Sequence, residues 1–165
     1  MSYWVRAFCT TETVPTIHGF LTWLRDKARY NASVPHERPA ALKTLKWKSF
    51  ELVYDPDRNS ILVECNRNTG DRSLCAREVQ EQLDALEGVE DSEAKARVAE
   101  CLTRTRFIIC CRVDRDPNHE EAFNVRGALD YFVDQCGALL EVEDEGFYSC
   151  SDMPLLGSCV EDEDA

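Results

Sequence analysis

Hydrophobic and polar residues alternate along several short stretches of the chain, a pattern typical of half-buried β-strands. Six such runs predict strands at residues 3–9, 50–55, 61–66, 106–113, 138–142 and 146–150. The turn-forming stretches PDRNS and EDEG separate the second run from the third and the fifth from the sixth. Each of these two pairs therefore predicts a β-hairpin.

Apolar residues at helical spacing predict four helices between these strands. The first follows Thr-Val-Pro-Thr and ends near Tyr30, because proline is tolerated in a first helical turn. Ser73 and Ser92 are typical N-cap residues, because their hydroxyl groups can accept hydrogen bonds from the first turn of a helix. Gly137 can adopt the left-handed backbone conformation in which many helices end. The remaining three helices are predicted at 73–86, 92–102 and 120–136.

A strand, a helix and a hairpin follow one another twice, at residues 3–66 and 106–150, with the two helices of 73–103 between them. This order resembles the ferredoxin-like split βαβ fold and small bacterial proteins with duplicated βαββ halves. The resemblance implies an α+β fold in which two ferredoxin-like halves pack as one compact domain over 1–165. It further implies a mostly antiparallel sheet with helices on one face, the first and fourth strands at its centre and the third beside the first. The end of the chain, 158–165, is predicted to be an acidic tail.

The adjacent residues Cys110 and Cys111 lie within the predicted strand at 106–113. Successive side chains of a strand point to opposite faces of its sheet, so these two thiols cannot bind one metal ion. We expect Cys111 to lie in the helix-covered core and Cys110 to lie on the other face, beside Arg112.

The same alternation assembles a candidate ligand-binding face. Its members are Trp4, Arg6, Phe8, Glu64, Cys110 and Arg112, accompanied by Glu51 and Ile108. Trp4 and Phe8 are too apolar for a face left to water. One interpretation is that a helix of the second half or a second copy in a homodimer covers this face, with Arg–Glu pairs across the strands. The alternative is a binding face on which Arg6 and Arg112 hold a carboxylate or phosphate.

Composition narrows the function classes. The 165-residue chain has a net charge of −12, which repels nucleic-acid backbones and anionic membranes and favours a basic partner or simply solubility. No apolar run reaches the ~20 residues of a membrane span, and the start of the chain does not have the pattern of a secretion signal. These features predict a cytosolic protein. The nine cysteines include no Cys-x-x-Cys pair and are expected to be buried thiols.

Three further segments have a structural and a functional interpretation. The basic segment 36–48 is either a solvated connection anchored by Trp47 or a binding loop. DRDPNHEE, at 114–121, is either an acidic helix entry or a hard-cation site, and the first is favoured because the stretch contains no turn glycine. The acidic turn at 141–145 either protects a sheet edge from pairing or docks a basic protein.

The chain has no nucleophile motif, phosphate-binding glycine loop or zinc-ligand spacing. We therefore expect no catalytic residues, no metal and no cofactor. The sequence favours a non-enzymatic cytosolic bacterial protein that binds a basic partner, such as a toxin that it neutralises. The alternative is a sensor or enzyme for a small anionic ligand that uses Arg6, Glu64 and Arg112.

Overall fold

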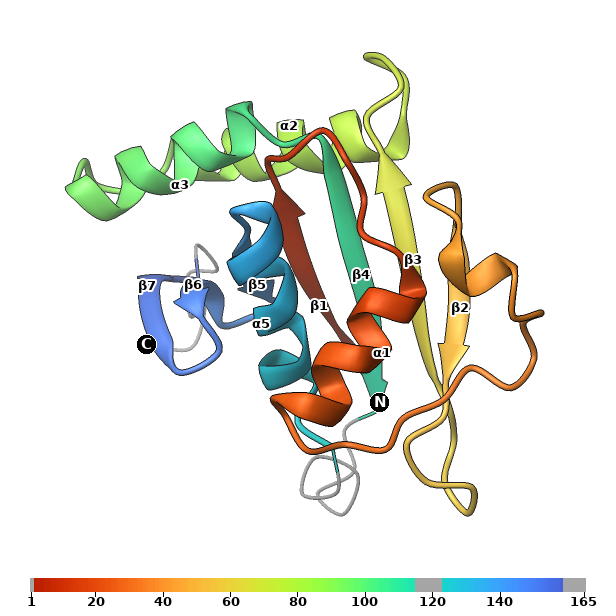
Figure 1. Ribbon diagram of the computed structural model, residues 1–165. Helices are drawn as coiled ribbons and strands as arrows, with labels where there is room; N and C mark the ends of the chain where they lie inside the picture. The colour runs from red at the N-terminus through yellow and green to blue at the C-terminus, as the bar shows by residue number, and fades with distance from the viewer. Residues whose placement is uncertain (1, 115–122, 159–165) are drawn as a thin grey trace.

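The structure is a computed structural model that describes residues 2–114 and 123–158. Its centre is a seven-stranded sheet in the order β2-β3-β4-β1-β5-β6-β7, and every neighbouring pair of strands is antiparallel (Figure 1). The strands are β1 Ser2–Cys9, β2 Ser49–Leu52, β3 Ile61–Arg67, β4 Phe107–Asp114, β5 Leu139–Val142, β6 Gly146–Cys150 and β7 Met153–Gly157. The six predicted strands are confirmed, and β7 is an addition to them.

The described residues form four α-helices and one short 3-10 turn. They are α1 Ile17–Asp26, η1 Ala41–Lys43, α2 Leu74–Leu86, α3 Glu93–Thr103 and α5 Val125–Cys136. Ser73 and Ser92 cap α2 and α3 through their side chains, as predicted, and Gly137 ends α5 in the left-handed conformation. α5 begins at Val125, after the N-cap residue Asn124, and the expected start at 120 lies outside the described residues.

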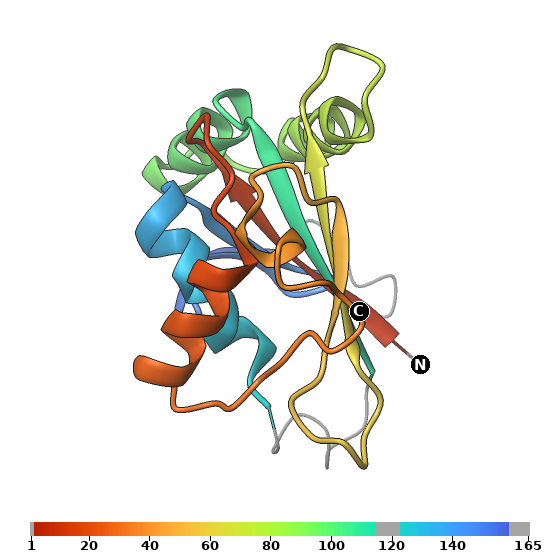
Figure 2. The same cartoon turned by 45° about the vertical axis from the view of Figure 1, so that its right-hand side comes forward.

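Helices cover both faces of the sheet, which corrects the expectation of helices on one face. α1 and α5 lie against one face, and α2 and α3 cross the end of the other (Figures 1 and 2). From the sequence, α2 and α3 are expected only to connect the two halves of the chain. Their buried residues, among them Cys75, Leu86, Val98 and Leu102, instead form the outer half of a second hydrophobic core. An apolar helix stripe has to be buried somewhere, and the uncovered sheet face is where it packs.

Strand parity separates the two adjacent cysteines as predicted. Cys111 belongs to the core under α1 and α5, and Cys110 belongs to the core under α2 and α3. Both residues are only 2% exposed, so Cys110 is as deeply buried as its neighbour. Phe8 and Ile108, which were expected on the same face as Cys110, are fully buried beside it.

The strand order differs from the ferredoxin-like expectation at one point. β1 and β4 are central neighbours as expected, but β3 pairs with β4 and not with β1. The two hairpins also join the central strands differently. The β2–β3 hairpin pairs through its second strand, β3, and the β5–β6 hairpin pairs through its first strand, β5. The structure is therefore α+β with a seven-stranded antiparallel sheet, and a duplication of ferredoxin-like halves is not confirmed.

Candidate functional site

The expected binding face lies partly beneath α2 and partly in the open. In register, Arg6 of β1 is opposite Cys110 of β4, which is opposite Glu64 of β3. Phe8 and Cys110 are buried, Trp4, Arg6 and Glu64 are half-buried, and Arg112 is exposed. The side chains of this face are buried where α2 and α3 cover it, and their exposure increases towards the start of β1.

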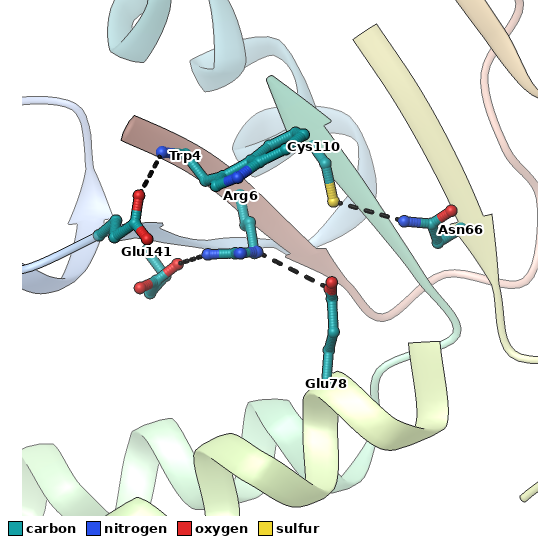
Figure 3. Close-up of polar contacts among 7 residues, drawn as sticks. Trp4, Arg6, Asn66, Glu78, Cys110 and Glu141 are labelled. Atoms are coloured by element: carbon teal, nitrogen blue, oxygen red, sulfur yellow. Dashed lines mark hydrogen bonds and ion pairs between the residues drawn. The ribbon is translucent and has the colours of Figure 1, made fainter. Parts of the chain in front are cut away.

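Arg6 is the centre of a partly buried ion-pair cluster (Figure 3). Its Nη1 atom donates a hydrogen bond to Oε2 of Glu141 on β5 at 3.0 Å, and its Nε atom lies 3.8 Å from Oε2 of Glu78 on α2. The three side chains are 18%, 9% and 21% exposed, respectively. The guanidinium group also lies over the Trp4 ring, 5.8 Å from its centroid. One cation therefore neutralises parts of two carboxylates and links the central strand, the second hairpin and α2.

Burial dominates the electrostatics of this cluster. It raises the pKa of both Glu141 and Glu78, and the nearby Arg6 offsets this rise only in part. For Arg6, burial lowers the pKa, but the Glu141 carboxylate more than compensates, and the pKa ends above its ordinary value. Oε2 of Glu78 accepts no hydrogen bond from the described residues. With two carboxylates for one guanidinium, the cluster has an excess of negative charge.

The Cys110 thiol is not activated for chemistry. Burial is the largest cause that raises its pKa far above that of a free thiol, and the Glu78 carboxylate adds to the rise. Its Sγ atom accepts a hydrogen bond from Nδ2 of Asn66 at 3.6 Å. Burial likewise raises the pKa of Cys111 to about 12. Nucleophilic thiols have a lowered pKa, so both residues act as packing groups in this fold.

The two arginines of the expected anion site have separate surroundings. Arg112 is exposed, and its Nε atom donates to Oγ of Ser2 at 2.9 Å. Arg6 is directed towards Glu78 and Glu141 instead (Figure 3). Glu51 lies at the outer strand β2, where its Oε2 atom is 3.8 Å from His36. Arg6 and Arg112 therefore have different partners in the structure.

Sequence reasoning missed Glu78 and Glu141, which complete the cluster. Glu141 had been assigned to an acidic turn, yet it is 7% exposed and its neighbours along β5 are buried. The alternation of LLEV places Glu141 on the same face as Leu139, a signal that was available. Glu78 lies one helical turn after the fully buried Cys75, so the spacing on α2 also indicated an inward side chain.

A pocket of about 370 Å³ opens beside this cluster. It is lined by Arg6 and Glu141, by Gln82 of α2, and by Glu143 and Asp144 of the turn between β5 and β6. Glu143 is tied to the sheet edge, because its Oε2 atom accepts a hydrogen bond from the backbone N–H of Trp4 at 2.9 Å. Three carboxylates and one guanidinium make this pocket acidic.

The basic segment 36–48 is anchored to the core, whereas most of the acidic segment 114–121 cannot be compared with its two interpretations. Trp47 is 6% exposed and its Nε1 atom donates to the carbonyl of Pro15, which supports the anchored-connection interpretation of 36–48. Most of DRDPNHEE lies outside the described residues. In the described ranges 2–114 and 123–158, no group of three or more His, Cys, Asp or Glu side chains is arranged to bind a metal ion. Nor does any helix there combine the length and apolarity that crossing a membrane requires.

In comparisons with known proteins, no protein-family model matches the chain, and no curated protein or solved structure matches it significantly.

Proposed function

We propose that this protein is a cytosolic, non-enzymatic binding protein whose partner is a basic protein. The observation that carries the proposal is the placement of its acidic residues. Between Arg77 and Lys95 the chain has no basic residue, and six of its acidic side chains are exposed: Glu81, Asp84, Glu87, Glu90, Asp91 and Glu93. They lie on α2, on the turn after it and at the start of α3. We call these six residues the acidic arm.

The arm is held in place by the packing beneath it. Cys75 and Leu86 of α2 and Val98 of α3 are buried against the sheet, and Arg6 pairs with Glu78 on the inner side of α2. Clustered charges of one sign attract an oppositely charged partner and speed its association. Lys95 meets only Asp91 of the arm, at 3.0 Å. The arm therefore keeps most of its negative charge for a partner.

Neutralisation of the arm tests the proposal. In one variant Asp84 and Asp91 become Asn and Glu87 and Glu90 become Gln. In a matched control, four exposed or half-exposed carboxylates elsewhere, at Glu12, Asp26, Glu37 and Asp57, are replaced in the same way. Both variants change the net charge from −12 to −8, because each removes four negative charges. Each immobilised protein is exposed to a cytosolic extract at low and at high salt, and bound proteins are identified by mass spectrometry.

The expected result is a basic protein that the native chain and the control retain at low salt and the arm variant does not. Salt should weaken this binding, since exposed charges are screened. If both variants lose the binder equally, net charge alone explains the retention and the proposal fails. It also fails if the retained binder is acidic or if its binding does not respond to salt.

A further inference from the structure

A second pocket, of about 300 Å³, lies at the C-terminal half of α3, whereas the turn of the acidic arm precedes the N-terminus of this helix. Arg97, Glu100 and Cys101 of α3 and its C-cap residue Arg104 line one part of the pocket, and Val133 of α5 and Leu139 of β5 form its apolar wall. Thr10, after β1, and Ser149 of β6 add hydroxyl groups. Its size is at the lower end of the range for small-ligand pockets, and an apolar floor with a few polar groups at the rim is their usual composition.

Two guanidinium groups at one pocket are unusual in a chain of net charge −12. Arg97 and Arg104 are seven positions apart, which places both on the same side of α3. Within the described part of the chain, Arg97 makes no ion pair or side-chain hydrogen bond. Arg104 lies 3.6 Å from Glu100, but both of those side chains are about two-thirds exposed, at 68% and 70%, and such pairs contribute little. Both guanidinium groups thus remain available to an anion.

Helix carbonyls near the pocket are already hydrogen-bonded, which limits their repulsion of an anion. The backbone N–H of Thr10 donates to the Cys136 carbonyl at the end of α5 at 2.9 Å. The Thr105 hydroxyl donates to the Cys101 carbonyl at the end of α3, also at 2.9 Å. Carbonyls left free at helix ends carry the partial negative charge of the helix dipole, and these contacts offset part of it.

We propose that this pocket binds a small organic carboxylate with a short apolar chain. The carboxylate is held by the guanidinium groups of Arg97 and Arg104, and the chain lies on Val133 and Leu139. Planar guanidinium groups match the geometry of a carboxylate, and the apolar wall accounts for an aliphatic tail that a bare phosphate does not have. This site is separate from the acidic arm and does not depend on the proposed protein partner.

The test is a titration of the folded protein with sodium hexanoate, followed by amide chemical shifts. Wild type is compared with an Arg97→Gln/Arg104→Gln variant and with a control, Arg72→Gln/Arg77→Gln, which removes two exposed arginines near the start of α2. We expect hexanoate to shift amides around Ala138 and Leu139, with affinity at least about tenfold weaker in the first variant and unchanged in the control. Glu100→Gln should have the opposite effect, about a two- to threefold gain, because it frees Arg104 and removes a repulsive charge.

The opposite results overturn the proposal. Hexanoate shifts that are absent or that lie away from the pocket show that it does not bind there. Sodium phosphate binding as tightly as hexanoate refutes the role of the apolar wall, and hexylammonium binding equally well refutes the role of the arginines. If circular dichroism shows that the double arginine variant is not folded, the Glu100→Gln variant decides the test. A Glu100→Gln variant that binds hexanoate no more tightly than wild type contradicts the proposed site.

Discussion

The Nη1 atom of Arg6 donates a hydrogen bond to Oε2 of Glu141 at 3.0 Å, although the two residues are 135 positions apart in the chain. Arg6 lies on the central strand β1, and Glu141 lies on the neighbouring strand β5, directly opposite in register. Glu78 approaches the same guanidinium from α2. These contacts tie α2 to the central strands in addition to the apolar packing beneath it, and mutation can test what they contribute.

Arg6→Met should destabilise the fold strongly at pH 7. The methionine fills a similar volume but leaves Glu141 and Glu78 buried without a cation, and breaking a buried pair costs on the order of 3 kcal/mol. Urea unfolding followed by circular dichroism measures the loss. The control is Arg112→Met, whose side chain is exposed on the same face. A loss for Arg6→Met no larger than that for the control contradicts a stabilising role for the cluster.

Glu78→Gln should make stability less dependent on pH. Burial raises the pKa of Glu78 above its ordinary value near 4.5, so the folded state holds this proton more tightly than the unfolded state does. The stability that the proton contributes is present below that ordinary value and is lost as the pH rises through the raised folded pKa. Glutamine removes this titration.

Unfolding free energies measured from pH 4.5 to pH 8 check this expectation. They should fall less steeply for Glu78→Gln than for wild type, whereas Asp84→Asn, an exposed change on the same helix that is not among the causes of the Glu78 shift, should follow the wild-type curve. Glu141 keeps its own raised pKa, so part of the slope remains. Parallel curves for Glu78→Gln and wild type would show that Glu78 titrates as it does in the unfolded chain.

The thiols of Cys110 and Cys111 should be unreactive in the native protein. Both are buried, and their pKa values are raised, so at pH 8 hardly any thiolate meets an alkylating reagent. Half-exposed Cys150 serves as the internal control: its hydrogen bond to Asp152 also raises its pKa, but the reagent can reach its thiol, so it should be modified faster. Mass spectrometry of peptides after brief iodoacetamide treatment, with and without urea, measures each site. Rapid native modification of Cys110 would contradict its position under α2.

The parts of the fold that depend on local patterns could be predicted from the sequence. Alternation along 106–113 placed Cys110 and Cys111 on opposite faces, and the serine caps at Ser73 and Ser92 were recognisable because capping is a contact within four residues. β7 was missed because MPLLG has no alternation and contains Pro154, which is tolerated only at a sheet edge. In the structure β7 is that edge strand.

The candidate site could be predicted only in part, because it depends on strand order. The side chains of β1 and β4 were assigned to the correct faces, but no local signal says that β5 pairs with β1 or that α2 lies across them. The partners of Arg6 come from those two elements. Pairings between distant segments are set by tertiary packing, so local patterns could suggest Arg–Glu pairs on this face but could not name Glu78 and Glu141 as the partners of Arg6.

Gly146→Ala should loosen β7 from the sheet. Gly146 has a φ of +111° and is opposite Gly157 in the β6–β7 ladder. A Cβ atom there would overlap the backbone of Leu156 and Gly157, which cannot move without shifting β7. Backbone strain at such a position costs on the order of 1–3 kcal/mol, and the overlap adds to it.

Gly70→Ala separates the two effects, because Gly70 also has a positive φ, +133°, but has open space where its Cβ would lie. Hydrogen exchange of the β7 amides provides the measurement. Exchange at Leu155 and Leu156 should accelerate at least about tenfold in Gly146→Ala, the equivalent of 1.4 kcal/mol of local opening, and remain at the wild-type rate in Gly70→Ala. Equal exchange in the two variants would mean that β7 does not depend on the close approach of its backbone to Gly146.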